Sequence, residues 1–432
     1  MRPWDLDEGV RMRRQQPHSW LLISFDQWRG DWLRQPWLRL PHLKRLAKEG
    51  WLAERCYTSC PHCVPARASW LTGLPPLELG LASNTSYTVS ANASSFVRDL
   101  SEAGYSTALI GKTHWTPHDL PGIDLRDNIP LLRALGFDRV REIAGPRALA
   151  VIECELTDRW REAGVWDAYR RDLANRYEGG CAHLVRPSVL PEALYPDLWV
   201  GTEALAELQA MPTDRPWFLW VSFPGPHEPF DVPARWRGVH PVSTIPRAEP
   251  RPDWADSLPA DCQLSRLMAR WPEGIPSRAL QELRADYADH LALLDVQVGN
   301  LMEALASRPD HSQVAVSVVS DHGELLGDWG LLLKGCFLEG AVRSLCLHRP
   351  PRGRWPWRSW GSRRPVPLTP ALQAMASMVR RGRRQHPLES LAAHPGPVVS
   401  IFAGERLEIR GDRRTMVLED GRRIDLPPQG HR

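Results

Sequence analysis

The sequence lacks any long hydrophobic run, and its net charge is small. Nothing in its 432 residues approaches the roughly 20 consecutive apolar residues of a membrane-spanning helix. A formal net charge of +3 offers no bulk electrostatic attraction for nucleic acid. These absences argue against a membrane protein and against a nucleic-acid-binding protein.

Signals for export and for disulfide bonding are also lacking. Arg11, Arg13 and Arg14 are not followed by an apolar segment of signal-peptide length. The 8 cysteines are scattered without the regular spacing of a disulfide framework, as expected of free thiols in a reducing compartment. We therefore expect a soluble, cytoplasmic protein.

Four short apolar runs, each ending in polar residues, predict buried strands at 19–25, 105–110, 216–223 and 313–320. Helical patterns lie between them, the longest at 282–306 with apolar residues in register. This alternation predicts an α/β fold with a large, mostly parallel sheet flanked by helices. Shorter helices are expected at 40–50, 66–71 and 96–103.

The composition changes after Arg349, where a segment rich in Arg, Trp and Pro begins. We predict an N-terminal extension at 1–17, a large α/β domain at 18–349, and a linker with a small C-terminal α+β subdomain at 350–432. Within that last part we expect a linker at 350–367, a helix at 368–379 and a small antiparallel sheet at 398–426.

Polar residues at two predicted strand ends suggest a metal site. Asp26 and Gln27 follow the first strand, and Asp321 and His322 follow the last. Ligands bind at the carboxyl edge of parallel sheets, where these strand ends can meet. Carboxylate and amide oxygens suit a hard divalent cation such as Ca²⁺, Mg²⁺ or Mn²⁺.

Cys63 begins a short motif just before the predicted helix at 66–71, whose N-terminus favours an anion. Other short motifs accompany it along the chain. In sequence order, they are Asp26-Gln27, Cys63-Val64-Pro65-Ala66-Arg67, Leu71-Thr72-Gly73, Gly111-Lys112-Thr113-His114, Pro226-His227 and Ser320-Asp321-His322-Gly323-Glu324. Together they make the chain resemble the sulfatase family, the formylglycine-dependent branch of the alkaline-phosphatase superfamily, with features of the phosphonate monoester hydrolases. The resemblance covers most of 20–347 and, more faintly, 400–426.

This resemblance implies a sulfuric ester hydrolase whose nucleophile is a formylglycine made from Cys63. Residue 63 would also be a metal ligand, together with Asp26, Gln27, Asp321 and His322. In sulfatases the position of Gln27 usually holds a second aspartate. The missing charge lowers the expected affinity for Ca²⁺, which stays the first choice, with Mn²⁺ and Mg²⁺ as alternatives.

The resemblance also assigns roles to other residues. Arg67, one helical turn beyond residue 63, would neutralise its charge, and Lys112 would bind a sulfate oxygen. His114 would be the base that releases the sulfate, while His227 and Lys334 would bind the substrate and stabilise the departing alcohol. Asn84 matches loosely a substrate-binding asparagine of the phosphonate-hydrolysing relatives. By contrast, we interpret His118, His183 and His290 as surface or satisfied core residues.

Three alternatives remain open. The same machinery would serve a phosphonate monoester or phosphodiester hydrolase. Cys60-Pro61-His62-Cys63 is also the motif of some thiol oxidoreductases. A non-catalytic remnant is the third, because Trp329 replaces a histidine of the family's Gly-Asp-His-Gly pattern and the C-terminal part is short.

The implied partners are a small sulfate or phosphonate ester and a formylglycine-generating enzyme that matures the protein. The sequence predicts no nucleic-acid or membrane partner. It decides neither the alcohol part of the substrate nor whether the chain forms a homo-oligomer.

Overall fold

In the computed structural model, the described residues are 17–118, 120–178, 183–270, 274–351, 361–362, 364–382 and 396–426. Residues 1–16 of the predicted N-terminal extension lie outside the described residues, as do Cys181 and residues 352–360 of the predicted linker. The statements below concern the described part of the chain.

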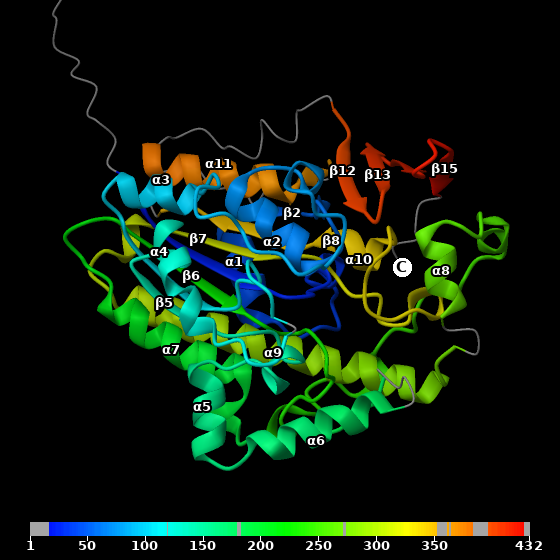
Figure 1. Ribbon diagram of the computed structural model, residues 1–432, viewed down its shortest axis with the longest axis horizontal. Helices are drawn as coiled ribbons and strands as arrows, with labels where there is room; N and C mark the ends of the chain where they lie inside the picture. Colours follow the sequence, from blue (N-terminus) through cyan, green and yellow to red (C-terminus); the bar gives the residue numbers. More distant parts are fainter. Residues whose placement is uncertain are drawn as a thin grey trace, which may run out of the picture.

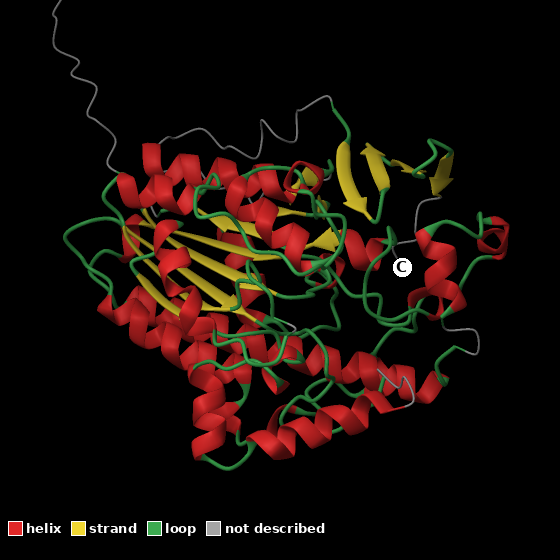
Figure 2. Cartoon of the chain, viewed as in Figure 1, coloured by secondary structure: helices red, strands yellow, loops and turns green. Residues whose placement is uncertain are grey.

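An eight-stranded sheet forms the centre of the molecule (Figures 1 and 2). Its paired strands are parallel except where β9 meets its two neighbours. This architecture confirms the predicted α/β class with a mostly parallel sheet. In spatial order the strands are β10 (Gly361–Ser362), β2 (Trp51–Ala53), β9 (Cys346–Arg349), β7 (Val314–Ser320), β1 (Ser19–Phe25), β6 (Trp217–Phe223), β4 (Ser106–Gly111) and β5 (Arg139–Glu142).

The register of the central strands brings the predicted polar residues to one edge. In β1, Phe25 pairs with Phe223 of β6 on one side and with Ser320 of β7 on the other. The three strands therefore end level with one another, and the residues that follow them emerge side by side. Asp26 and Asp321 are the first residues beyond β1 and β7.

Helices cover both faces of the sheet (Figure 1). Neighbouring residues of a strand point to opposite faces, so the side chains of β1 pack against both helical layers. Trp20 and Leu22 pack with α2, α3, α4 and α11, while Leu21, Ile23 and Phe25 pack with α1, α5, α6, α7 and α9. The first group comprises α2 (Cys63–Thr72), α3 (Phe96–Glu102), α4 (Ile129–Ala134) and α11 (Leu368–Arg381). The second comprises α1 (Pro41–Glu49), α5 (Glu155–Glu162), α6 (Trp166–Tyr177), α7 (Pro196–Ala210) and α9 (Ser277–Ala306).

The 30-residue helix α9 carries acidic side chains that bind neighbouring segments. Buried Asp295, for example, accepts hydrogen bonds from the backbone N–H groups of His42 and Leu43 at 3.1 and 2.7 Å. These N–H groups belong to the first turn of α1, so Asp295 caps that helix from outside. Neither α9 nor any other described helix has the combined length and apolar character that a bilayer crossing requires.

A smaller unit lies at one end of the large sheet (Figure 1). Its apolar residues pack with those of two short helices, α8 (Gln263–Ala269) and α10 (Glu339–Val342). Its four antiparallel strands confirm the predicted sheet at 398–426 and are β12 (Val398–Phe402), β13 (Glu405–Arg410), β14 (Arg413–Val417) and β15 (Arg423–Leu426). A separate three-stranded sheet consists of β11 (Val366–Pro367), β3 (Cys56–Tyr57) and β8 (Arg343–Ser344).

Helix α11 packs on the large sheet, although the predicted boundary at residue 349 places it in the C-terminal subdomain. Its buried Leu372 and Met375 share one core cluster with Trp20 and Leu22 of β1. The helix contacts both α2 and α3. On packing, we assign α11 to the large domain and only the β12–β15 sheet to the smaller unit.

This packing predicts that shortening Leu372 destabilises the large domain. Because Leu372 is fully buried, Leu372→Ala should lower the free energy of unfolding by about 2–5 kcal/mol, as cavity-forming core substitutions do. Urea unfolding followed by Trp fluorescence measures the change, with Arg381→Ala at the exposed end of the same helix as control. An unfolding midpoint equal to that of the unaltered protein would show that α11 does not support the large domain.

Candidate active site

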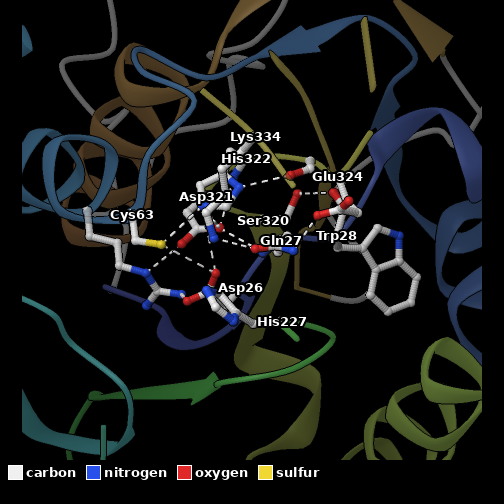
Figure 3. Close-up of polar contacts among 12 residues, drawn as sticks. Asp26, Gln27, Trp28, Cys63, His227, Ser320, Asp321, His322, Glu324 and Lys334 are labelled. Carbon is white, nitrogen blue, oxygen red and sulfur yellow. Dashed lines mark hydrogen bonds and ion pairs between the residues drawn. The ribbon is translucent and has the colours of Figure 1, made fainter. Parts of the chain in front are cut away.

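Four potential metal ligands converge at the carboxyl edge of the sheet (Figure 3). One donor atom from each of Asp26, Cys63, Asp321 and His322 lies within 4.8 Å of the others, and all four side chains are buried. The backbone N–H of Asp321 donates to the carbonyl of Phe25 at 3.2 Å, so the two strand ends are held together. The structure thus brings together four of the five predicted metal ligands.

The imidazole of His322 is oriented for such a role. Its Nδ1 lies 2.9 Å from the carbonyl oxygen of Gly323, to which it can donate as Nδ1–H. Nε2 is then the ring nitrogen that faces Cys63 and Asp26 with its lone pair. Burial lowers the pKa of His322, but the charges of Asp321 and Cys63 outweigh it and raise that pKa. The cluster therefore attracts positive charge, and its donor set fits a divalent cation.

Two buried cations hold the carboxylates in place. The Nε of Arg67 donates to Asp321 at 2.7 Å, and the ammonium of Lys112 binds Asp26. Burial raises the pKa of Asp26 and so does Cys63, but Lys112, His227 and Arg67 together bring it well below its ordinary value. Arg67 hydrogen-bonds Asp321, the carbonyl of Lys112 and the hydroxyl of Ser222, and its predicted neutralisation of residue 63 stays a prediction.

Lys112 is positioned by a very close approach of two strands. A Cβ atom at Gly111 would lie 1.9 Å from the carbonyl oxygen of Ser222, so only glycine fits there. The Ser222 hydroxyl donates to the carbonyl of Lys112 at 2.6 Å and accepts from Arg67 at 3.0 Å. This serine, which the sequence analysis missed, couples the two cations through β6.

Cys63 is the first residue of α2, all ten residues of which are buried. Its Sγ lies 3.2 Å from Nε2 of His322 and 3.6 Å from Oδ1 of Asp26. Burial raises the pKa of this thiol, but Lys112, Lys334 and His322 lower it well below its ordinary value. In a formylglycine residue, the oxygens on Cβ would take the place of this sulfur.

Gln27 is part of a polar network rather than of the four-ligand cluster. It has a positive φ of 70°, and its backbone N–H donates to Asp321 at 2.9 Å. Its carboxamide accepts from Lys334 through Oε1 and donates through Nε2 to Glu324 and, at 3.0 Å, to Glu228. A metal contact of Gln27 stays a prediction, because its oxygen is bound to Lys334 here.

The two carboxylates of this network were not assigned a role from the sequence. Glu324 accepts from the backbone N–H groups of Leu326 and Leu333 at 3.1 and 2.5 Å, and so shapes the loop that carries Lys334. Burial, followed by repulsion from Glu228, raises the pKa of Glu324 to about 7. Glu324 ends one recognised motif and Glu228 follows another. Only the fold brings both acids to the carboxamide of Gln27.

His227 and Lys334 both interact with the charge of Glu228. The Nδ1 of His227 is 2.8 Å from the carbonyl oxygen and 3.1 Å from Oε2 of Glu228. These contacts fix the ring and leave Nε2 as its other nitrogen. Burial lowers the pKa of Lys334, but the charges of Cys63 and Glu228 raise it above its ordinary value, so the ammonium is retained.

The segment before His227 is anchored by a buried pair. Asp197 accepts from the backbone N–H of Gly225 at 2.9 Å, and its other oxygen lies 2.8 Å from Nε2 of His290. A Cβ at Gly225 would lie 2.4 Å from that oxygen, so a larger residue does not fit. His290 is thus a satisfied core residue, as interpreted from the sequence.

His114 and His118 stack on one another beside the cluster, with ring centroids 4.8 Å apart. His114 hydrogen-bonds Cys63, and burial together with Lys112 lowers its pKa to about 3. The interpretation of His118 as a surface or satisfied core residue is wrong. It is buried, and neither ring nitrogen has a hydrogen-bond partner, although Nε2 lies 3.4 Å from Glu142.

Asn84 lies next to the nucleophile position. Its Oδ1 accepts from the backbone N–H of Val64 at 2.9 Å, and its own N–H donates to Nδ1 of His62 at 3.0 Å. It therefore caps the N-terminus of α2. Its proposed contact with substrate remains a prediction.

The structure explains the two features that favoured a thiol oxidoreductase and a non-catalytic remnant, the Cys60–Cys63 motif and Trp329. Cys60 is fully buried, and burial raises the pKa of its thiol, so the pair Cys60 and Cys63 does not suit thiol exchange with a partner. Trp329 packs edge-on against Trp254 at 5.3 Å, and its backbone N–H donates to the carbonyl of Glu249 at 2.7 Å. Trp329 thus packs in the core instead of joining the metal-ligand cluster.

Comparison with known proteins supports the resemblance to the sulfatase family. The family model described as Sulfatase matches residues 18–360. An arylsulfatase of Clostridium perfringens is 30% identical over 333 residues, or 75% of this chain and 66% of that protein. A choline-sulfatase of Rhizobium meliloti is 26% identical over 339 residues, or 75% of this chain and 60% of that protein. This chain therefore belongs to the sulfatase family, while matching less than two thirds of the length of these relatives.

Solved structures share the fold of this chain. The phosphonate monoester hydrolase SpPMH from Silicibacter pomeroyi superposes with a TM-score of 0.75 over 96% of this chain and 89% of that chain. The sequence identity is 19%, so this likeness concerns the fold alone. The predicted family and fold are both confirmed.

The four-ligand cluster predicts that a divalent cation stabilises the protein. Mn²⁺ or Ca²⁺ at about 100 times its dissociation constant should add about 2.7 kcal/mol to the free energy of unfolding. Asp321→Ala should remove this gain, because it deletes one of the four clustered donors. Thermal unfolding with and without the cation measures the effect.

The matched control for this experiment is Asp286→Asn. This carboxylate is also buried, but it lies outside the cluster. The metal assignment is wrong if the cation leaves the unfolding temperature of the unaltered protein unchanged.

Proposed function

We propose that this chain hydrolyses sulfate esters through a formylglycine formed from Cys63. The observation that supports this proposal is the position of residue 63 at the start of α2, inside the cluster of Asp26, Asp321 and His322. The family and its named sulfatase relatives support the same reaction.

Asp26, residue 63, Asp321 and His322 would hold one divalent cation, and Gln27 is the fifth proposed ligand. Such a cation acts as a Lewis acid that stabilises charge on the attacking and sulfuryl oxygens. Ca²⁺ is our first choice, with Mn²⁺ or Mg²⁺ as alternatives. Arg67 and Lys112 pair with the carboxylates of Asp321 and Asp26 and hold them in place, and so preserve the geometry of the ligands.

A hydrated formyl group provides one oxygen for attack on sulfur and a second hydroxyl for the later release of sulfate. Lys112 and Lys334 both bring positive charge to residue 63 and would bind the oxygens of the sulfate group. His114 is neutral at ordinary pH, because its pKa is lowered to about 3, and it contacts residue 63. It is therefore free to accept the proton of the second hydroxyl.

His227 and Lys334 would serve the departing alcohol. Both contacts of Nδ1 of His227 are with acceptor oxygens of Glu228, so Nδ1 carries a proton, and donation to the alcohol would come from Nε2 of the imidazolium form. Lys334 retains its positive charge and would stabilise the alkoxide as it leaves. Asn84, at the N-terminus of α2, is proposed as a further substrate contact.

A phosphonate monoester or phosphodiester is the second candidate substrate. Gln27, in place of a second aspartate, favours it, because this residue also occurs in relatives of the phosphonate-hydrolysing branch. The transferred group of these esters carries one negative charge, as that of a sulfate ester does. The cations described here do not distinguish the two substrate classes by charge.

We further propose that the protein works in the cytoplasm after maturation by a formylglycine-generating enzyme. Seven cysteines lie in the described part of the chain, and all seven are free thiols, which suits a reducing compartment. The sequence around Cys63 carries the Cys-x-Pro-x-Arg pattern that such an enzyme would read.

The nucleophile assignment predicts different outcomes for two cysteines. Cys63→Ala should reduce kcat on 4-nitrophenyl sulfate on the order of 10⁴-fold or more, as loss of a nucleophile does. Cys60→Ser should retain most of the activity, because Cys60 takes no part in the proposed reaction. Mass spectrometry of the peptide containing residue 63 should detect the aldehyde in the active protein. An unmodified thiol in a fully active sample would contradict the proposal.

Substrate preference is tested with three esters that share one leaving group. The proposal predicts a higher kcat/KM for 4-nitrophenyl sulfate than for 4-nitrophenyl phenylphosphonate. It predicts the lowest value for 4-nitrophenyl phosphate, whose second negative charge calls for further cationic contacts. Initial rates with Ca²⁺, Mn²⁺ or Mg²⁺ added to metal-free protein give the ranking. A phosphonate preference with every metal would replace the main proposal with its alternative.

A further inference from the structure

A cavity of 840 Å³ opens directly beside the residues that would handle the leaving group. Lys112, His114 and His227 form its inner end. Its outer walls come from the segment between β5 and the end of α6, which includes Ala148 and Tyr177. An alcohol released at the inner end therefore has this space in front of it.

Much of the wall is apolar. Ala148 and Val151 line one part, and Leu173 and Ala174 of α6 line another. The ring of Tyr177 adds an aromatic surface. Walls of this kind favour a ring-bearing or branched hydrocarbon group over a heavily hydroxylated one, because the apolar surface loses its contact with water.

The cavity also carries positive charge at Arg147 and Arg170. The guanidinium of Arg147 lies 4.7 Å from the centroid of the Tyr177 ring, and its contact with Glu228 at 3.4 Å uses one of its N–H donors. The Nε of Arg170 donates to the carbonyl of Ala150 at 2.7 Å. Both side chains are about half exposed, at 53% and 43%, so their remaining donors can reach a bound anion.

Each of the two arginines has one carboxylate nearby: Arg147 lies 3.4 Å from Glu228, and Arg170 lies 3.4 Å from Asp167. Each of these contacts uses one nitrogen of the guanidinium group. Among the described residues that line the cavity, Glu153 is the one carboxylate, and it pairs with Arg161 at 3.3 Å. The two nitrogens of buried His118 and the buried hydroxyl of Tyr177 lack hydrogen-bond partners in the described residues. Unpaired buried polar groups are costly, but these atoms are not accessible, so a ligand in the cavity reaches them only if the side chains move.

We infer that this cavity binds the alcohol part of the substrate, and that this alcohol carries an apolar ring with an acidic substituent. The ring lies against Leu173 and Tyr177, and the acidic group binds Arg147 and Arg170. Cationic alcohols such as choline are disfavoured by the two guanidinium groups. This inference rests on the proposed function, because it takes His114 and His227 to mark the leaving-group side.

The test compares probes that cannot be hydrolysed. 4-Methylbenzenesulfonate and 4-sulfobenzoate differ in one carboxylate, and N,N,N-trimethyltaurine, the sulfonate that corresponds to choline sulfate, represents a cationic alcohol. Isothermal titration calorimetry of the full chain with bound Mn²⁺ should give about tenfold tighter binding for 4-sulfobenzoate than for 4-methylbenzenesulfonate, the value of one charged hydrogen bond. N,N,N-Trimethyltaurine should bind most weakly.

Variants connect this preference to particular residues. Arg170→Gln and Arg147→Gln should each reduce the preference for 4-sulfobenzoate to near unity while leaving the affinity for 4-methylbenzenesulfonate within about threefold. Arg171→Gln is the matched control, because this exposed arginine lies on the same helix and does not line the cavity. Arg170 contacts none of the proposed catalytic residues, so its variant is the more informative of the two.

Three results would overturn the inference: equal affinity for the two arylsulfonates, equal effects of Arg170→Gln and Arg171→Gln, or tightest binding of N,N,N-trimethyltaurine. Absence of measurable binding by either arylsulfonate also counts against it.

Hydrolysis of 4-nitrophenyl sulfate is assayed on the same samples. Discrimination without turnover contradicts the proposed reaction alone, and turnover without discrimination contradicts the cavity assignment alone.

Discussion

The site depends on the balance between two buried carboxylates and two buried cations. Asp26 and Asp321 have no access to solvent, and ionised carboxylates are costly to bury unless they are paired. Lys112 and Arg67 provide that pairing from the end of β4 and from α2, two elements that the chain reaches after β1 and before β7. The same pairing holds both carboxylates within the four-ligand cluster, so charge neutralisation and ligand geometry have one common origin.

The sequence predicted those parts of the site that local patterns encode. Apolar runs that end in a polar residue located the strands carrying Asp26 and Asp321, and parallel pairing then brought them together. The helical pattern at 66–71 predicted a helix beside Cys63, although α2 begins three residues earlier, at Cys63 itself. The roles of Lys112, His114, His227 and Lys334 came from family resemblance, since no local rule gives a lone lysine or histidine a partner.

What the sequence did not predict are contacts between distant segments. Glu228 and Glu324 meet at the carboxamide of Gln27, about 200 and 300 residues away along the chain, and such meetings depend on the whole topology. The antiparallel strand β9, between β2 and β7, was also missed, because it is only four residues long and ends in His348 and Arg349. The cavity wall comes from the least regular part of the sequence, where no periodicity marks a function.

The burial of α2 limits when Cys63 can be modified. Cys63 is 1% exposed, and α2 is covered by α11, which is translated roughly 300 residues later. A modifying enzyme that must grasp Cys63, Pro65 and Arg67 finds them accessible only while the C-terminal part of the chain has yet to dock. The proposed oxidation therefore takes place after translation of this segment and before the domain has folded. A chain that folds with a thiol at residue 63 could no longer be converted.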